Sequence, residues 1–118
     1  MASIAIVLGS VRPGRVGEQV VRWIEDQARQ LDGVQTVFFD LRDYELPLFA
    51  EEMSPSMKAP ELAEAVRLRT NLEANDAVLF VTPEYNHSVS GALKNAIDYL
   101  PPATLKEKAV GLVGYSWY

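Results

Sequence analysis

The sequence predicts an α/β protein in which helices cover a parallel β-sheet, and three observations support this fold class. Short apolar segments typical of buried strands alternate with segments in which apolar residues recur at helical spacing. The connections between successive strands are long, as parallel neighbours require. The chain has 118 residues, which suits one domain and is too short for two.

The first strand is expected at residues 3–8, an almost wholly apolar run that Gly9 and Ser10 end. A helix is expected from residue 16 to near Gly33, because apolar residues fall near helical spacing there. Its inner face is expected to consist of Val16, Val20, Trp23, Ile24 and Leu31. Residues 34–39 are β-branched and aromatic, which predicts the second strand.

A long, partly ordered loop is expected after Asp40, because three prolines, two serines and two methionines follow it. Pro60 suits the first turn of a helix that runs to about Asn75. The inner face of this helix is expected to consist of Leu62, Ala63, Val66 and Leu72. A third strand is expected at residues 76–82, where Pro83 ends it.

The last predicted elements are a helix and a strand. Ser90 is a suitable cap for a helix that runs through Leu100, and two prolines stop this helix. Residues 108–114 supply the fourth strand. In parallel sheets, ligands bind at the carboxyl ends of the strands, so the loops after the strands are the candidate binding segments.

Composition and charge exclude several classes of function. Cysteine is absent, which excludes thiol catalysis, thiolate metal sites and disulfides. The net charge of -5 offers no basic surface for nucleic acid or for an anionic membrane. No apolar run approaches the ~18 residues of a membrane span, and the N-terminus lacks the pattern of a signal peptide. A cytoplasmic protein without nucleic-acid or membrane partners is therefore expected.

The loop at residues 9–17 joins the first strand to a helix N-terminus and is the first candidate site. A helix N-terminus attracts anions through its unpaired N–H groups. Arg12 and Arg15 are suited to charge-assisted hydrogen bonds with phosphate, and Ser10 adds a hydroxyl donor. These residues predict a phosphate site, whereas the alternative interpretation makes both arginines solvated loop residues.

Two better-known phosphate loops fit this segment poorly. Its first eight residues nearly match the P-loop pattern, but Arg15 replaces the lysine and Val16 replaces the hydroxyl that holds magnesium. The glycine spacing also fails the dinucleotide pattern, so a ribose-binding role for Asp40 has little support. An NTPase is therefore not expected.

The loop at residues 82–91, after the third strand, is polar and aromatic and forms the second candidate site. Pro83 stiffens it, and Asn86 is suited to tie the loop to itself, which favours contact with the edge of a flat heteroaromatic ring. His87 is the only histidine and has no cluster of metal ligands around it, so no metal is expected. General-base catalysis by His87 is a weaker alternative to a polar surface role.

Three motifs together resemble the NADPH-dependent FMN reductases, a flavodoxin-like family that includes quinone, azo-dye and chromate reductases. They are Gly-Ser-Val-Arg at residues 9–12, Pro-Glu-Tyr-Asn at 83–86 and Ser-Gly-Ala-Leu-Lys-Asn-Ala-Ile-Asp-Tyr at 90–99. The resemblance covers the whole chain. It implies a flavodoxin-like, doubly wound parallel sheet in three αβα layers, with strand order 2-1-3-4 and a single FMN-binding domain at 1–118.

The resemblance also implies which residues bind the cofactor. The first loop would hold the FMN phosphate through Ser10, Arg12, Arg15, Val16 and Gly17. The second loop would contact the isoalloxazine through Pro83, Glu84, Tyr85 and Asn86, with Ser88 nearby. A third loop at residues 115–118, which includes Ser116, would run along the far edge of the ring. Trp23, Trp117, Met53 and Met57 are interpreted as packing residues instead.

The implied activity is oxidoreduction without a catalytic side chain. A hydride would pass from NADPH or NADH to flavin N5 and then reduce a quinone, azo compound, flavin or metal oxyanion. The alternatives are a flavodoxin-type electron carrier and an interaction module without a cofactor. The family pattern continues into a fifth strand that is absent here, so a truncated member is expected. Helix 90–100 carries more apolar residues than one side of a sheet-covering helix needs, namely Leu93, Ala96, Ile97, Tyr99 and Leu100. This surplus and the family resemblance together predict a homodimer or homotetramer through this helix.

Overall fold

Four parallel strands form one sheet in the computed structural model, which describes residues 1–117. The order across the sheet is β2-β1-β3-β4, confirming the predicted topology. The strands are β1 (Ala2–Leu8), β2 (Val34–Asp40), β3 (Ala77–Pro83) and β4 (Ala109–Tyr115). The three helices are α1 (Gly17–Ala28), α2 (Ala63–Glu73) and α3 (Gly91–Asp98).

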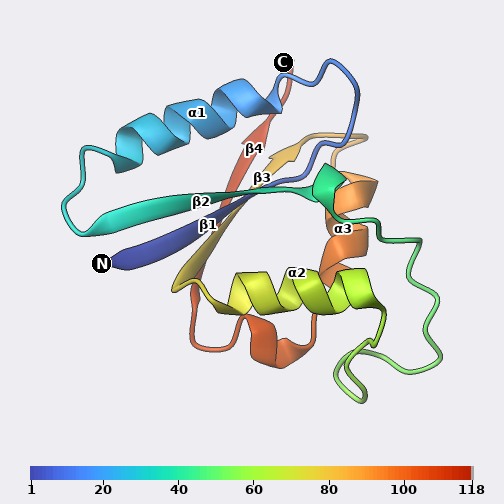
Figure 1. The fold of residues 1–118 in the computed structure, drawn as a ribbon. Coiled ribbons are helices and arrows are strands. Elements are labelled where there is room, and N and C mark those ends of the chain that lie inside the picture. The colour runs from blue at the N-terminus through green and yellow to red at the C-terminus, as the bar shows by residue number, and fades with distance from the viewer. Residues whose placement is uncertain (118) are drawn as a thin grey trace.

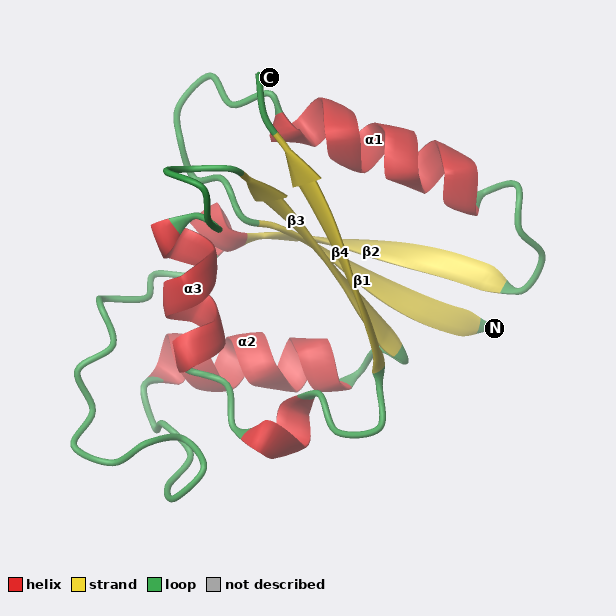
Figure 2. Ribbon diagram, turned by 180° about the vertical axis from the view of Figure 1, so that it is seen from behind, coloured by secondary structure: helices red, strands yellow, loops and turns green. Residues whose placement is uncertain are grey.

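The helices cover the two faces of the sheet unequally. Helix α1 lies on one face, and α2 and α3 lie on the other (Figures 1 and 2). Side chains alternate along each strand, so β1 contributes Ala5 and Val7 to the α2 and α3 side and Ile6 and Leu8 to the α1 side. Burial on both faces explains why β1 is a nearly continuous apolar run.

The start of α2 differs from its prediction. The helix begins at Ala63, because the preceding Leu62 has non-helical backbone angles, with a ψ of 127°. The Pro60 carbonyl accepts a hydrogen bond from Arg69 Nη1 at 2.6 Å, outside the helix. The predicted start at Pro60 is therefore wrong. The buried residues of α2 are Ala65, Leu68 and Leu72, whereas the predicted inner residues Leu62 and Ala63 are exposed and Val66 is half-buried.

Helix α1 also presents a different face to the core from the one predicted. Val21 is buried, and Val20 and Ile24 pack beside it. Trp23 is 61% exposed, because it lies on the flank of this stripe, and Leu31 is exposed beyond the end of the helix. The predicted inner positions of Trp23 and Leu31 are wrong.

A short 3₁₀ helix (Leu41–Asp43) opens the long loop after β2, and α3 holds the next segment in place. The Phe49 N–H donates to Asn95 Oδ1 at 2.8 Å, and the Tyr99 hydroxyl donates to the Pro47 carbonyl at 2.9 Å. These contacts confirm a partly ordered loop. Further along it, the side chains of Met53 and Met57 are exposed, so their predicted packing role is not seen in this chain.

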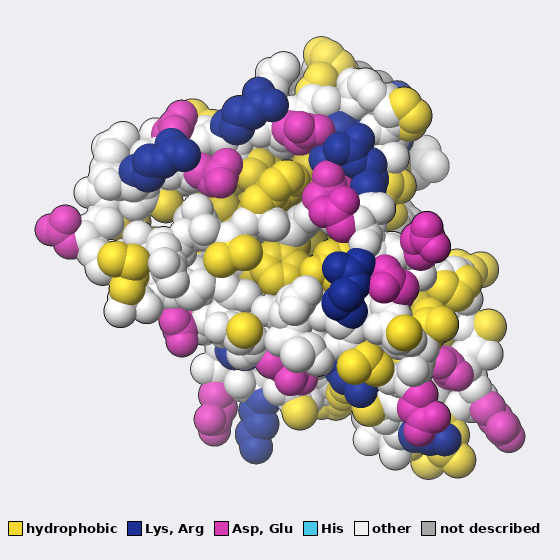
Figure 3. Space-filling view, viewed as in Figure 1, with side chains coloured by type: hydrophobic (Ala, Val, Ile, Leu, Met, Phe, Trp, Pro, Cys, Tyr) yellow, Lys and Arg dark blue, Asp and Glu magenta, His cyan; other side chains and the backbone are white. Residues whose placement is uncertain are grey.

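The surface carries charges of both signs, interspersed among apolar side chains (Figure 3). A second 3₁₀ helix (Pro102–Thr104) connects α3 to β4. Within residues 1–117, no helix has the length and apolar character needed to span a membrane; the longest, α1, has 12 residues.

Candidate functional site

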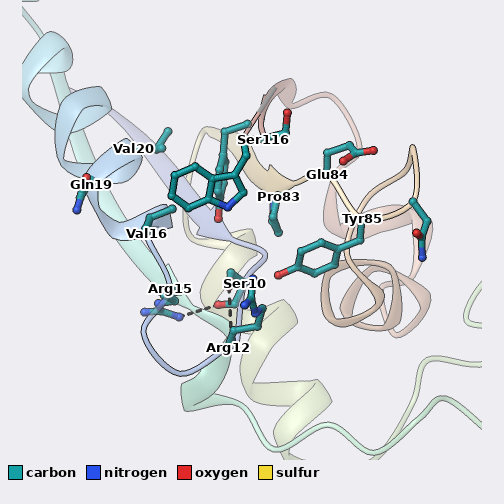
Figure 4. A pocket seen from close by; sticks show the side chains of 13 residues that line it. Ser10, Arg12, Arg15, Val16, Gln19, Val20, Pro83, Glu84, Tyr85 and Ser116 are labelled. Carbon is teal, nitrogen blue, oxygen red and sulfur yellow. Dashed lines mark hydrogen bonds between the residues drawn. The ribbon is translucent and has the colours of Figure 1, made fainter.

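A cavity of about 770 Å³ lies at the carboxyl ends of the strands, beside the N-terminus of α1 (Figure 4). Its volume falls within the usual range for small-molecule sites. Three segments that are distant in sequence converge on it: the 9–17 loop with the start of α1, the loop after β3, and the residues after β4. The lining residues are Ser10, Arg12, Arg15, Val16, Gln19, Val20, Pro83, Glu84, Tyr85, Asn86, Tyr115, Ser116 and Trp117.

All of the predicted site residues line this cavity except Gly17 and Ser88. Gly17 is buried at the start of α1, and Ser88 lies on the outer side of the second loop, paired with Tyr85 through its backbone. The structure thus brings together the first two predicted loops and residues 115–117 of the third, whose residue 118 lies outside the described residues. Their roles toward a ligand remain predictions.

Four lining residues were not assigned as cofactor contacts: Gln19 and Val20 of α1, and Tyr115 and Trp117 of the predicted third loop. Val20 lies one helical turn after Val16, so the spacing of α1 contains the signal that would have identified it. Trp117 was interpreted as a packing residue, but its side chain is 86% exposed and borders the cavity. The packing interpretation of Trp117 is therefore wrong.

The end of the cavity next to α1 suits an anion. Val16 is the N-cap residue of α1, and its side chain makes no capping hydrogen bond. The Gln19 N–H donates to the Val16 carbonyl at 3.0 Å, and the Val16 side chain satisfies none of the other N–H groups of the first turn, which point toward the cavity end of the helix. Arg12 is exposed beside this turn, and the buried Ser10 hydroxyl accepts from the Arg12 N–H at 3.4 Å. Figure 4 shows Ser10, Arg12 and Tyr85 grouped at this end.

Arg15 differs from Arg12 because its guanidinium is buried in contacts within the protein. Nη1 and Nη2 donate to the two carboxylate oxygens of Asp40 at 2.8 and 2.6 Å. Nε donates to Glu18 at 2.9 Å, and Nη1 also donates to the Ser10 carbonyl at 2.7 Å. The hydrogen bond to Asp40 raises the pKa of Arg15, so this side chain stays charged.

Asp40 lies at the end of β2 and is held by two arginines. Burial opposes ionisation of its carboxyl group, but hydrogen bonds from Arg15 and Arg42 outweigh burial and hold the pKa of Asp40 well below its usual range. These bonds occupy both carboxylate oxygens. The geometry therefore gives no support to the ribose-binding alternative.

The second loop is a tight turn with an unusual backbone. Tyr85 and Ser88 exchange two backbone hydrogen bonds of 3.0 and 3.2 Å. The residues between them, Asn86 and His87, have positive φ angles of 53° and 68°. The His87 N–H donates to Glu84 Oε1 at 2.6 Å, whereas the His87 side chain is fully exposed. Its exposure favours the surface role over general-base catalysis.

Buried contacts fix the first loop to neighbouring elements. Ser90 caps α3 by accepting from the Leu93 N–H at 3.1 Å, and its hydroxyl donates to the Gly9 carbonyl at 2.6 Å. The Gly9 N–H donates to the Val81 carbonyl at 2.7 Å. Gly17 packs so closely that a Cβ there would overlap the Tyr115 hydroxyl and approach Leu8 Cδ1 to 2.6 Å. Burial also raises the pKa of Tyr115, so its phenol stays protonated at neutral pH.

The arrangement suits a ligand with an anionic end and a flat, largely apolar body. Helix N–H groups and Arg12 occupy one end, and the apolar side chains of Val16, Val20, Pro83 and Trp117 border the rest. Among the residues that the structure describes, no group of three or more His, Cys, Asp and Glu side chains is placed to hold a metal ion.

Comparison with known proteins identifies similar sequences and folds. The family described as NADPH-dependent FMN reductase matches residues 2–117. An NAD(P)H-dependent FMN reductase, ntnL, from Nectria sp is 38% identical over 106 residues, covering 85% of this chain and 53% of that protein. A quinone reductase from Pseudomonas putida is 41% identical over 96 residues, covering 81% of this chain and 48% of that protein.

A solved structure shares the fold as well. The FerB flavoenzyme NAD(P)H:(acceptor) oxidoreductase from Paracoccus denitrificans superposes with a TM-score of 0.72 at 30% identity. The match covers 97% of this chain and 60% of that one. The chain thus spans about half the length of the curated relatives it matches.

Proposed function

The chain belongs to the NADPH-dependent FMN reductase family, and from this premise we propose that it binds FMN in the cavity beside α1. We propose further that it takes part in NAD(P)H-dependent reduction of a small-molecule acceptor, such as a quinone, an azo compound, a flavin or a metal oxyanion. The observation that supports this most is that one cavity combines an anion end with an apolar, aromatic lining. The anion end consists of Arg12 and a helix N-terminus without a side-chain cap.

The residues present fit FMN at both ends. The phosphate would lie against the N–H groups of the first turn of α1, with Arg12 and Ser10 as side-chain donors. The isoalloxazine would lie along the rigid segment from Pro83 to Asn86, with Ser116 at its far edge. Arg15 faces the same cavity, but its guanidinium is engaged elsewhere.

When bound, FMN supplies the redox chemistry by accepting a hydride from the nicotinamide and delivering electrons to the acceptor. The protein's contribution is orientation and electrostatics. The backbone between Glu84 and Ser88 is fixed by hydrogen bonds in which the N–H groups of Tyr85, His87 and Ser88 are the donors, so the shape of the turn is set before a ligand arrives. We assign no side chain as a general acid or base.

Titration of the purified chain with FMN, followed by flavin fluorescence, tests cofactor binding. Riboflavin is the matched ligand, because it lacks only the phosphate. We expect FMN to bind more tightly than riboflavin. Equal affinities for FMN and riboflavin would contradict the proposed phosphate site. If neither flavin bound, the interaction module without a cofactor would be favoured.

NADPH absorbance, recorded with FMN bound and a quinone as acceptor, tests the reaction. We expect NADPH oxidation that depends on both FMN and the quinone. FMN binding without turnover would instead support a flavodoxin-type electron carrier. Arg12 in the first loop favours the reductase, because flavodoxin phosphate loops are rich in serine and threonine hydroxyls.

A homodimer or homotetramer through helix 90–100 also remains a proposal. The apolar side chains that suggested it, among them Ile97 and Leu100, pack against the core within the chain. Lys94 and Asp98 form an ion pair with each other on the outer side of α3. The family resemblance is thus the remaining support. Sedimentation at micromolar concentration tests it, and a monomer would exclude it for this chain.

A further inference from the structure

Four charged side chains lie together where the first loop meets the end of β2. Besides the Arg15 contacts to Asp40 and Glu18, Arg42 Nη2 lies 3.1 Å from Asp40 Oδ2 and 3.4 Å from Glu18 Oε1. We call Arg15, Glu18, Asp40 and Arg42 the loop-base cluster. It contains two positive and two negative groups, so it presents no net charge to an anion in the cavity.

Burial separates the members of the loop-base cluster. The side chain of Arg15 is 2% exposed and that of Asp40 is 14% exposed, whereas that of Arg42 is 44% exposed. Both terminal nitrogens of Arg15 donate to the carboxylate of Asp40. This bidentate geometry holds a guanidinium firmly in place. The Arg15 and Asp40 pair is therefore the rigid part of the cluster.

The donors of Arg15 are nearly all used within the protein. A guanidinium has five N–H groups. One bonds to Glu18, one to the Ser10 carbonyl and two to Asp40. At most one is left for another acceptor. Arg15 thus has the positive charge that suits a phosphate, but most of its N–H donors are used within the protein.

We propose that Arg15 and Asp40 position the phosphate loop and do not bind the phosphate. This inference rests on the proposed function. Asp40 at the end of β2 accepts hydrogen bonds from Arg15, and Arg15 donates to the Ser10 carbonyl. These two links, called the clamp below, fix the Ser10 hydroxyl at the cavity. The loop between Ser10 and Arg15 contains Gly14, which has a φ of +66° and open space where a Cβ would lie, so packing at Gly14 does not support the loop.

The proposal predicts that Asp40→Asn changes phosphate affinity in the direction opposite to the one expected from charge alone. Asp40 carries a negative charge near the anion end of the cavity, so removing that charge should strengthen binding of a phosphate if Asp40 acts through its field alone. If Asp40 acts through Arg15, Asp40→Asn releases the loop and weakens binding. The sign of the change therefore separates the two roles.

The main test measures the affinities of FMN and riboflavin for the wild type, Asp40→Asn and Arg42→Gln by flavin fluorescence. Arg42→Gln is the matched control, because it removes the exposed partner of Asp40 and leaves the buried one. We expect Asp40→Asn to weaken FMN about tenfold, with riboflavin changed less than about twofold. Arg42→Gln should leave both affinities near those of the wild type.

Three outcomes of this titration would overturn the proposal. FMN affinity that rises or stays constant in Asp40→Asn would show that the carboxylate does not position the loop. Equal losses for FMN and riboflavin would show a general loss of structure. Equal losses of FMN affinity in Asp40→Asn and Arg42→Gln would show that the exposed contact between Asp40 and Arg42, which both variants remove, matters more than the buried pair.

Arg15→Lys provides a second variant in case Asp40→Asn does not fold. Lysine keeps the positive charge but lacks the planar fork that engages both carboxylate oxygens. We expect Arg15→Lys to lose FMN affinity about as strongly as Asp40→Asn does. If Arg15→Lys retained wild-type FMN affinity, Arg15 would be acting as a point charge on the phosphate.

Hydrogen exchange without any ligand separates this proposal from the proposed function. The amide N–H groups of residues 10–12 and 14–16 should exchange faster in Asp40→Asn than in the wild type, and Arg42→Gln should not change them. Unchanged exchange in Asp40→Asn would refute the clamp even in a chain that binds no flavin. If the wild type bound no FMN but the variants differed in exchange as expected, FMN binding would be refuted and the clamp would stand.

Discussion

The two loops that line the cavity are held in different ways. The 9–17 loop is held by side chains from other elements: Asp40 at the end of β2 holds Arg15, and Ser90 at the start of α3 holds the Gly9 carbonyl. The Glu84–Ser88 turn is held mainly by its own atoms, through the Tyr85 and Ser88 backbone pair.

This difference determines how each loop responds to change. The first loop depends on partners 25 and 81 positions away in sequence, so a substitution far from it should disturb it. The second loop depends mainly on its own atoms, with one link to β4 through the Glu84 N–H and the Tyr115 carbonyl, so changes within the turn should matter most. The predictions below test this contrast.

Gly17→Ala should have the largest effect on stability, because it disrupts the close packing beneath the first loop. An added Cβ would overlap the Tyr115 hydroxyl and the buried Leu8 side chain. We expect the free energy of unfolding to fall by about 3 kcal/mol, the upper range for overpacking. Urea denaturation measures this change.

Gly91→Ala is the control for Gly17→Ala, because both glycines are the first residue of a helix and a Cβ at Gly91 meets no atom. It should leave the stability unchanged or raise it slightly. If the two variants had equal stability, the packing of Tyr115 against Gly17 would be too soft to constrain the site.

Ser90→Ala should have the next largest effect. It removes the cap of α3 and leaves the buried Gly9 carbonyl without its hydroxyl donor. We expect a loss of about 2 kcal/mol in the free energy of unfolding. The control is Ser88→Ala, an exposed serine that pairs with Tyr85 through its backbone. Similar melting curves for the two variants would contradict the claim that the first loop depends on α3.

The same contrast explains how much the sequence could predict. The strands, and the candidate residues 83–86, follow from local patterns: apolar runs, a proline and a polar, aromatic turn. The role of Arg15 does not, because its partner Asp40 is 25 residues away and the pairing exists only once β1 and β2 are adjacent. Likewise, the orientation of Trp23 and the exposure of Trp117 depend on how α1 and the end of β4 pack, which spacing alone does not fix.

Arg12→Ala tests the part of the first loop that faces the ligand. The Arg12 side chain is exposed at the anion end of the cavity, unlike that of Arg15. We expect FMN affinity to fall about tenfold, about 1.4 kcal/mol, with riboflavin affinity unchanged. Arg22→Ala, an exposed arginine further along α1, removes the same charge outside the cavity. An equal loss in both variants would indicate a general effect of net charge.

His87→Gly should have the smallest effect, and its direction should be opposite. Histidine at a φ of 68° is strained by its Cβ, whereas glycine adopts this conformation without that cost. The His87 side chain is fully exposed, so its loss removes little packing. We expect the free energy of unfolding to rise by about 0.5 kcal/mol, because relief of strain exceeds the entropy lost by glycine. Asn86→Gly is the control, since asparagine tolerates a positive φ well, and it should change the stability less. If His87→Gly lowered the stability, the turn would depend on the imidazole, and the second loop would not be held by its backbone alone.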